Sequence, residues 1–303
     1  MKRQLLCICV SAALLAGCTG DGETTVPDHD GRVPLQVNSG IHVQTRAYDD
    51  KWETGDAIGI YMLNGETAES ENNRYTTAAD KQATGSFSAA DGQTVYFPAS
   101  GDTRDFIAYY PWQDIPKGST TYRVDVATQD PQQAIDLMGA TKVTGKDKSD
   151  PEVTFRFTHK LVKLVLTIRP AAGMSGSDLQ GLKVTLTNQR TQATYDVLKG
   201  DDVTVDTGVA ATAIPLKTAA DGASAEGIVL PAADTADMLL TFTLSDGGTP
   251  LTWAVKDAPL SRRFVAGSKY LYTITIGKTD LEVTSTVTDW APGNGSGESG
   301  SAQ

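Results

Sequence analysis

Alternation of apolar and polar residues is the feature that most limits what this chain can fold into. From Val33 onward the sequence either alternates with period two or runs through short apolar stretches, and turn residues follow about every 8 to 15 positions. In Val33–Gln44 the alternation is clear on both sides of a Ser39–Gly40 break, where we expect the register to be reset. Helical periodicity is limited to Gln132–Met138 and Ser177–Leu182, which predict short helical turns. Because successive side chains of a strand face opposite sides, the pattern predicts antiparallel β-sandwiches and not a βαβ fold.

Length and local composition predict two domains. The chain has 303 residues, and the polar stretch Val143–Glu152 separates two strand-rich regions. We therefore expect an N-terminal β-sandwich domain over residues 33–150 and a C-terminal one over residues 151–290. In the second domain, Val153–Ile168 is expected to form one continuous strand. The tail, residues 291–303, is rich in Gly and Ser and is predicted to be disordered.

The N-terminus has the pattern of a lipoprotein signal peptide. A basic pair, Lys2–Arg3, precedes the apolar stretch Leu5–Ala16, which is too short to span a bilayer comfortably. The stretch ends in Leu15–Cys18, which resembles a bacterial lipobox of one branched residue, two small residues and a cysteine. We expect residues 1–17 to be removed by cleavage between Gly17 and Cys18, after the Cys18 thiol has received a diacylglycerol. A plain secretory signal with an incidental cysteine is the alternative.

The other cysteines leave no pairing partner for Cys18. The chain has three cysteines, and Cys7 and Cys9 lie in the signal peptide. The mature chain is therefore expected to form no disulfide and to hold no metal through thiolates. Residues 18–32 are polar and predict a flexible tether between the lipid and the fold. No later segment approaches the roughly 20 apolar residues of a membrane span, so we expect a lipid anchor rather than a spanning helix.

The charge balance argues against nucleic acid as a partner. Asp and Glu number 37 against 26 Lys and Arg, which gives a formal net charge of -11. Phosphates would be repelled over most of such a surface. We therefore expect partners other than DNA or RNA.

No arrangement of residues points to catalysis or to metal binding. The three histidines, His29, His42 and His159, lie far apart in the sequence, and none belongs to a His-Glu-x-x-His motif. The sequence also contains neither a Gly-x-Ser-x-Gly elbow nor a Walker loop. His159 shares a strand face with Phe155 and Phe157, which favours a hydrogen-bonded structural histidine over a general base. We predict a protein without enzymatic activity, catalytic residues, cofactor or metal.

The densest aromatic cluster, Tyr109–Trp112, allows two interpretations. Its rings could form a platform on which a sugar stacks. Alternatively, the aromatic residues of a strand pack into the sandwich, and Pro111 ends that strand. Packing is the favoured interpretation, and sugar stacking on Tyr109, Tyr110 and Trp112 stays open.

Four groups of residues between Thr45 and Trp290 carry a resemblance to a known family. They are Thr45–Ala47 with Trp52–Tyr61, Val95–Pro98 with Asp105–Pro111, Asp136–Ala140 with Phe155–Leu164, and Val287–Trp290. Each group is short, but their order and spacing make the combination specific. Together they resemble the fimbrillin-like lipoproteins of Bacteroidales, the family that includes major and accessory subunits of type V pili.

The resemblance implies an all-β fold of two tandem transthyretin-like antiparallel β-sandwich domains without catalytic activity. It also implies export as a lipoprotein to the outer membrane, surface exposure, and a structural or adhesive role beside other fimbrial subunits, identical or accessory. For pilus subunits it implies that an arginine-specific protease trims the first strand region, which opens a groove for a strand of the next subunit. The family also has anchor, tip and non-polymerising members. A surface lipoprotein that binds glycan or a host protein without polymerising is therefore the alternative.

Arg46–Ala47 is the candidate site of that trimming. It follows the alternating stretch Val33–Gln44, where a loop should begin before Trp52. Cleavage there would release the first strand and leave two rows of backbone groups unpaired. Leu281–Val287 alternates in a similar way and is either a candidate donor strand or a resident strand of the second domain. In the simpler alternative, Arg46 is an ordinary surface charge and the first strand stays in place.

Overall fold

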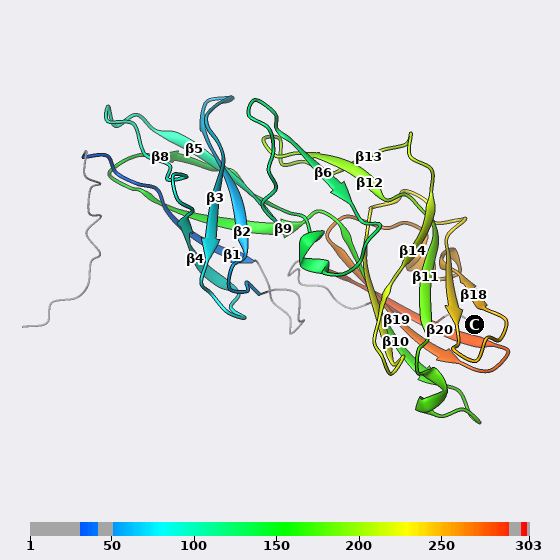
Figure 1. The fold of residues 1–303 in the computed structure, drawn as a ribbon. Coiled ribbons are helices and arrows are strands. Elements are labelled where there is room, and N and C mark those ends of the chain that lie inside the picture. Colours follow the sequence, from blue (N-terminus) through cyan, green and yellow to red (C-terminus); the bar gives the residue numbers. More distant parts are fainter. Residues whose placement is uncertain (1–30, 42–50, 291–297, 302–303) are drawn as a thin grey trace, which may run out of the picture.

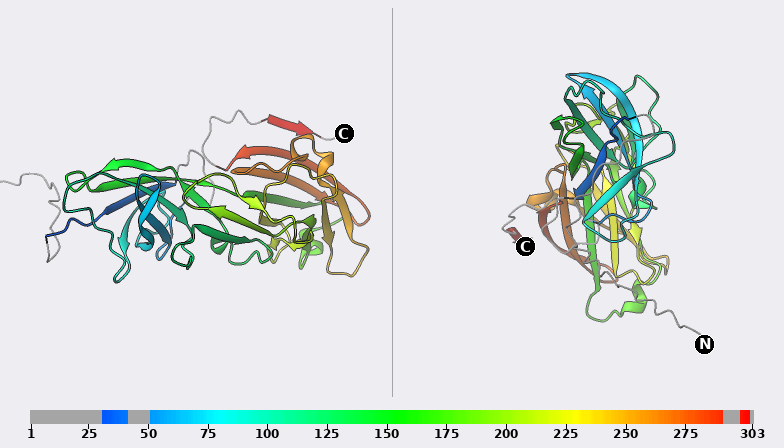
Figure 2. Two further views of the ribbon diagram at one scale, coloured as in Figure 1. Left: turned by 90° about the horizontal axis from the view of Figure 1, so that it is seen from above. Right: turned by 90° about the vertical axis from the view of Figure 1, so that its left-hand side faces the viewer.

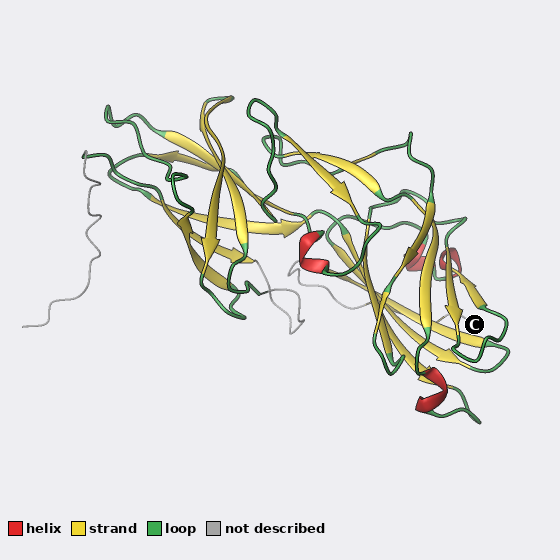
Figure 3. Cartoon of the chain, viewed as in Figure 1, coloured by secondary structure: helices red, strands yellow, loops and turns green. Residues whose placement is uncertain are grey.

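The computed structural model describes residues 31–41, 51–290 and 298–301. Within these ranges strands dominate (Figure 3), which confirms the all-β prediction. Two strand-rich halves lie end to end in an elongated molecule (Figure 1), and Figure 2 shows the same arrangement from two further directions. The helices are single 3-10 turns, and the first two overlap the predicted helical turns. They are η1 (Gln132–Ala134), η2 (Gly176–Leu179), η3 (Val255–Asp257) and η4 (Pro259–Ser261).

The strands of the first half close into a ring. Seven of them follow one another in the order β2-β3-β4-β1-β9-β7-β5, and a further pairing of β2 with β5 completes the circle. β8 pairs with β5 beside this ring. The prediction of two tandem transthyretin-like sandwiches stays a prediction, because this half is barrel-like. Its strands are β1 (Gln36–Ile41), β2 (Ala57–Asn64), β3 (Thr67–Thr77), β4 (Thr84–Ala89), β5 (Arg104–Tyr110), β7 (Met138–Ala140), β8 (Val143–Lys146) and β9 (Glu152–His159).

The second half is built from open sheets. Its six-stranded sheet has the order β15-β16-β10-β19-β20-β21, and its four-stranded sheet has the order β14-β11-β17-β18. The strands of the larger sheet are β15 (Lys217–Thr218), β16 (Ser224–Val229), β10 (Val162–Pro170), β19 (Ser268–Ile276), β20 (Leu281–Asp289) and β21 (Glu298–Ser301). Those of the smaller sheet are β14 (Thr212–Pro215), β11 (Lys183–Gln189), β17 (Leu239–Thr243) and β18 (Leu251–Ala254).

Not every neighbouring pair is antiparallel, which corrects the sequence-based prediction. β1 runs parallel to β9 in the first half, and β10 runs parallel to β19 in the second. In both cases a long stretch of chain separates the two strands, as a parallel pair requires. Alternation along a single strand does not show the direction of its neighbours, so the sequence pattern could not reveal these two pairs.

The chain passes between the halves at a different place from the predicted boundary near residue 150. β9 still belongs to the ring, and β10 begins the six-stranded sheet, so the passage falls at Lys160–Leu161. Val153–Ile168, expected as one strand, is thereby divided between two sheets. A three-stranded sheet also crosses this boundary, because a strand of the first half pairs with two of the second. Its strands are β13 (Thr204–Val205), β12 (Gln192–Asp196) and β6 (Thr121–Asp125).

The three-stranded sheet ties the halves together by covering the outside of the ring. Tyr61 of β2 and Tyr109 of β5 belong to the same hydrophobic cluster as Tyr122 of β6 and Tyr195 of β12. β2 and β5 are consequently buried on both faces. Gly139 of β7 makes room for this contact, because a Cβ atom there would collide with the Tyr195 hydroxyl.

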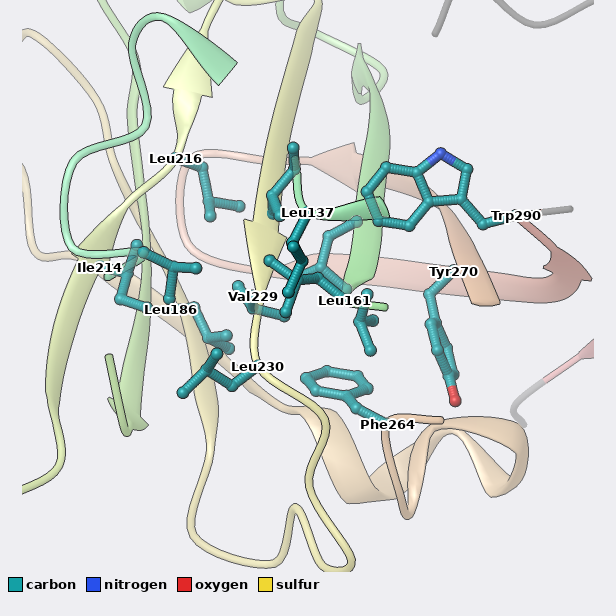
Figure 4. Packing of buried hydrophobic residues seen from close by; sticks show 14 of the residues in the cluster. Leu137, Leu161, Leu186, Ile214, Leu216, Val229, Leu230, Phe264, Tyr270 and Trp290 are labelled. Carbon is teal, nitrogen blue, oxygen red and sulfur yellow. The ribbon is translucent and has the colours of Figure 1, made fainter. Parts of the chain in front are cut away.

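Two hydrophobic clusters organise the core. The first fills the ring and is rich in aromatic residues, with Trp52 at its centre. The second continues from the covered outside of the ring into the space between the sheets of the second half. Figure 4 shows Leu161 and Val229 of this second cluster packed between Leu216 on one side and Tyr270 and Trp290 on the other.

Candidate functional site

The position of β1 in the ring is the first element of the candidate site. Its six residues lie between β4, which is antiparallel to it, and β9, which is parallel. The ring is therefore complete only while a strand occupies this place. Just before β1, Leu35 N–H donates to the Val95 carbonyl and Phe97 N–H donates to the Val33 carbonyl, both across to the segment that follows β4.

The side chains of β1 alternate without interruption. Leu35, Val37, Ser39 and Ile41 are all buried, and the residues between them face outward. The expected reset at Ser39–Gly40 is wrong, because Ser39 simply takes the inward position that an apolar residue would fill. Its hydroxyl lies in the core without a hydrogen-bond partner among the described residues. Since a buried hydroxyl without a partner is destabilising, β1 fits its place imperfectly.

On its outer face β1 is joined to both neighbours through Asn38. The Asn38 amide donates to Glu152 Oε1 of β9 at 2.8 Å, and the Ser86 hydroxyl of β4 donates to Asn38 Oδ1 at 2.8 Å. This outer face is hollowed, with a volume of about 540 Å³ over β4, β1 and β9. Polar side chains, among them Thr154 and Arg156, line the hollow.

A smaller pocket of about 150 Å³ lies where β1 ends, and we call it the junction pocket. Its lining comes from both halves. The strands of the ring contribute Ile41, Tyr110 and Met138, and the chain before β2 contributes Lys51, Trp52, Glu53 and Asp56. The residues in and after η1 contribute Gln132, Gln133 and Asp136, and the second half contributes Lys163, Lys217, Glu226 and Ile228.

Acidic side chains of the junction pocket are engaged by neighbours. The Tyr110 hydroxyl donates to Asp56 Oδ1 at 3.0 Å, and the Glu53 amide donates to Asp56 Oδ2 at 2.8 Å. Burial nevertheless raises the pKa of the Asp56 carboxyl, because desolvation outweighs both hydrogen bonds. Asp136 Oδ1 lies 2.8 Å from His159 Nδ1.

Lys163 is buried at the wall of this pocket. Its ammonium donates to Gln132 Oε1 at 2.5 Å and lies 3.0 Å from Glu226 Oε2. The charge is thereby compensated, as a buried lysine requires. Lys163 was not among the predicted site residues, although a single lysine inside the apolar run Leu161–Val165 is an available signal of a buried, partnered charge.

His159 has the structural role that the sequence predicted. It is 4 % exposed, pairs with Asp136, and stacks on Trp290 with ring centroids 4.0 Å apart and an angle of 7° between the planes. Since His159 ends β9 and Trp290 follows β20, the stack joins the ring to the second half.

The aromatic cluster at the end of β5 packs into the protein. Tyr109 and Tyr110 are 0 % and 5 % exposed, so neither ring can serve as a platform for a sugar in this structure. Trp112 is half-buried, and the Arg74 guanidinium lies 5.0 Å from its ring centroid. The packing interpretation is confirmed for Tyr109 and Tyr110.

The remaining predicted site residues fall outside the described residues. These are Gly17 and Cys18 of the lipobox and Arg46 and Ala47 of the candidate trimming site. Leu281–Val287 lies within β20, which pairs with β19 at nine positions and is a resident strand here. Within the described ranges there is no group of three or more His, Cys, Asp or Glu side chains that could hold a metal ion. Nor does any helix of these ranges have the length and apolar character to cross a bilayer.

The protein is all-β, and its candidate site is the place of β1 in the ring. A strand is held there by main-chain hydrogen bonds to β4 and β9. The fimbrillin-like family matches residues 45–290, and the chain belongs to this family. It is 54% identical over 306 residues, 100% of both chains, to a protein of Bacteroides uniformis assigned as fimbrium subunit Fim1C.

Solved structures agree with this assignment. A crystal structure of a Bacteroides uniformis protein assigned to cell adhesion is 51% identical, with a TM-score of 0.79 over 87% of this chain and 99% of that chain. A second protein, from Bacteroides ovatus, is 22% identical with a TM-score of 0.66 over 87% of this chain and 99% of that chain, and shows the likeness of fold.

Proposed function

We propose that the chain is a subunit of a cell-surface fimbria in which β1 is exchanged for a strand of a neighbouring subunit. The family and the similarity to a fimbrium subunit support the fimbrial role. The observation that carries the exchange is the position of β1. It is short, near the N-terminus, inserted between two strands of a closed ring, and imperfectly fitted at Ser39.

The energetics of the ring favour replacement of β1 over its simple loss. Leu35, Val37 and Ile41 are buried, and full burial of such side chains contributes roughly 1.5–3 kcal/mol each. An empty place would also leave the facing backbone groups of β4 and β9 unpaired. An incoming strand would restore the burial of apolar side chains and the backbone hydrogen bonds to β4 and β9. If it had an apolar residue at the position of Ser39, the unpartnered hydroxyl would also be gone. Exchange would therefore run toward the assembled state.

Export and maturation complete the proposal. Cleavage between Gly17 and Cys18 and acylation of Cys18 would bring the chain to the outer membrane as a lipoprotein. A cut after Arg46 would then sever β1, which ends at Ile41, from the rest of the ring, which resumes with β2 at Ala57. The lipid would leave with the severed segment, since Cys18 precedes β1 in the sequence.

A non-polymerising surface lipoprotein that binds glycan or a host ligand is the second candidate. Burial of Tyr109 and Tyr110 removes the platform first suggested for it. The observation that still favours it is the hollow over β1, whose lining includes Arg156 and several residues that carry hydroxyl groups. A binder of this kind would keep β1 and its N-terminal lipid.

Shearing of cells and N-terminal sequencing of the surface protein separate the two candidates. We expect heat-resistant ladders in the sheared fraction and an N-terminus at Ala47. Arg46→Ala should abolish the ladders while leaving export intact, and Arg263→Ala, at an exposed arginine of the second half, should change neither. A surface protein that is wholly monomeric and still begins at acylated Cys18 would contradict the proposal.

The lipid anchor has its own test. Cys18→Ala should prevent labelling with a fatty-acid probe and release the exported chain from the membrane fraction. Labelling that persists in this variant would show that the lipobox interpretation is wrong.

A further inference from the structure

The junction pocket at the end of β1 contains two buried hydrogen-bond donors that lack acceptors. Trp52 is 0 % exposed, and its indole Nε1 has no partner among the described residues. Gln132 is 7 % exposed, and its Nε2 is likewise without one. Both side chains line the pocket, but the two donor nitrogens are covered, so an acceptor could reach them only when the strand that ends here is exchanged.

The Gln132 amide is held in a fixed orientation. Lys163 Nζ donates to Gln132 Oε1 at 2.5 Å, and Lys163 is in turn close to Glu226. The bond to Lys163 assigns the oxygen to one side of the amide and thereby fixes where the Nε2 donor lies. The Trp52 indole is fixed as well, because Phe87, Tyr110 and Phe157 contact it edge to face. The donors are therefore preorganised.

The other charges of the pocket narrow the chemistry of an occupant. Asp56 accepts from Tyr110 and from the Glu53 amide, and Asp136 lies against His159. These carboxylates already have donors, which argues against a cation as the missing group. The two pocket groups without partners among the described residues are both donors, and their partners would be acceptors such as backbone carbonyls or the side-chain oxygens of Asn, Asp, Gln or Glu.

We propose that the junction pocket binds the end of the strand that a neighbouring subunit inserts in place of β1. The proposal rests on the fimbrial function argued above. Ile41 is the last residue of β1 and also lines the pocket. A strand that takes the place of β1 between β4 and β9 therefore brings its own backbone to the pocket. Oxygens at that end would accept from Trp52 Nε1 and Gln132 Nε2, which makes the pocket a determinant of partner choice and register.

A photo-crosslinker introduced into the full chain tests where the strand ends. Gln133 is exposed and lines the pocket, so Gln133→p-benzoylphenylalanine places the probe at its mouth. After irradiation of assembled fimbriae we expect an adduct between two subunits, with the partner peptide mapped to the inserted strand. The matched control, Asp246→p-benzoylphenylalanine at an exposed turn of the second half, should give no adduct with that peptide. An adduct within one chain, or none, would overturn the proposal.

A pair of glutamine variants separates binding from folding. Gln132→Met removes the unpartnered donor, whereas Gln129→Met removes an amide that is fully bonded to Val126 and Ile228. We expect Gln132→Met to lower the melting temperature of the monomer, because the buried Lys163 also loses an acceptor, and to reduce polymer about tenfold. Gln129→Met should lower the melting temperature and still assemble.

The outcomes distinguish this inference from the proposed function. If the unmodified chain forms no ladders, the fimbrial function fails and the pocket proposal fails with it. If the unmodified chain forms ladders and Gln132→Met forms them equally well, only the pocket proposal is overturned.

Discussion

The two halves of the molecule differ in whether their sheets have free edges. The first half closes its strands into a ring, so that each of the seven has two neighbours. The second half leaves β15, β21, β14 and β18 as edge strands of two open sheets. A closed ring cannot lose one strand without opening, whereas an open sheet can lose an edge strand and keep the rest of its pairing. The ring is therefore the half in which one short strand controls the integrity of the whole.

The hydrophobic cores of the two halves also differ, because the core of the ring is rich in aromatic residues and that of the second half is mainly aliphatic. In the ring, Phe87, Tyr110 and Phe157 surround Trp52 edge to face, with ring centroids 5.0, 5.3 and 5.4 Å from it. The second half relies mainly on Leu, Ile and Val side chains between its sheets. A few large rings around one indole give the first half a well-defined shape with few residues.

Alkaline pH should have the largest effect and should weaken the ring more than the second half. In the ring, burial raises the pKa of Tyr61 and Tyr75 to about 12 and also raises those of Tyr109 and Tyr110. In the second half it raises those of Tyr270 and Tyr272, and in the sheet that joins the halves those of Tyr122 and Tyr195. A raised pKa stabilises the fold fully below pH 10, where the unfolded chain keeps its tyrosines protonated. That stability is lost as the pH rises from 10 through the folded-state values. We expect a loss on the order of 1 kcal/mol per tyrosine and pH unit.

Urea unfolding at pH 9, 10 and 11 measures this effect. In protein labelled with fluorotryptophan, the separate fluorine resonances of Trp52 and Trp112 report on the ring, and those of Trp253 and Trp290 on the second half. The ring signal should move to lower urea first. Tyr61→Phe, which removes a hydroxyl without a partner among the described residues, should lessen the alkaline loss and change little at neutral pH. An equal loss of stability with pH in Tyr61→Phe and in the unmodified chain would contradict the assignment.

Val37→Asp is expected to have the next largest effect. Val37 is 4 % exposed in the middle of β1, so the change buries a carboxylate in the ring and should cost roughly 3–5 kcal/mol. Hydrogen exchange should rise in β4 and β9 and stay low in β10 and β19. The matched change Val283→Asp lies in β20 of the second half and should give the reverse pattern. Uniform exchange throughout the chain in both variants would show that the halves do not respond separately.

Gly139→Ala should loosen the connection between the halves. The added methyl group would collide with the Tyr195 hydroxyl and with the Lys160 side chain. Overpacking of this kind costs typically about 1–3 kcal/mol. We expect faster exchange in β6 and β12 at nearly normal protection of β19. Restored protection in the double variant Gly139→Ala/Tyr195→Phe, which removes the clashing oxygen, would support the contact as the cause.

Ser39→Ala should have the smallest effect on the free energy of unfolding, and unlike the other variants it should raise it. It removes the unpartnered hydroxyl from β1, and the monomer should gain about 1 kcal/mol. Because β1 then fits better, polymer should form more slowly from the same amount of protein. Ser86→Ala, on the outer face of β4, removes a bonded hydroxyl and should not stabilise the monomer. Faster assembly of Ser39→Ala would contradict the imperfect fit of β1.

Much of this fold could be predicted from the sequence, and the predictions that were wrong have identifiable physical reasons. The period-two pattern predicts the strands, and the inward positions of Val37 and Ile41 follow from it directly. The passage between halves left a signal in the sequence, because the buried positions are odd-numbered up to Leu161 and even-numbered along Val162, Leu164 and Leu166. This change of phase, and not Val143–Glu152, marks where the chain changes sheets. Closure of the ring depends on the pairing of β2 with β5, which no local pattern encodes.

The candidate site was predictable only in part. The importance of the first strand followed from its alternation and from the resemblance to the fimbrillin-like family. The junction pocket did not, because Trp52, Gln132 and Lys163 are far apart in the sequence and meet only in the folded chain. Polar groups that are brought together by tertiary structure leave no periodic signal along the sequence.

A disulfide that locks β1 in place tests the central claim most directly. Asn38 of β1 and Ser86 of β4 face each other across the antiparallel pair, so Asn38→Cys/Ser86→Cys should form a disulfide under oxidation. A matched lock, Thr273→Cys/Thr284→Cys, joins β19 to β20 in the second half. We predict that the first variant forms heat-resistant ladders only after reduction, while the second forms them in both states. Ladders from the oxidised Asn38→Cys/Ser86→Cys protein equal to those of the unmodified chain would contradict the claim that β1 is the strand that is exchanged.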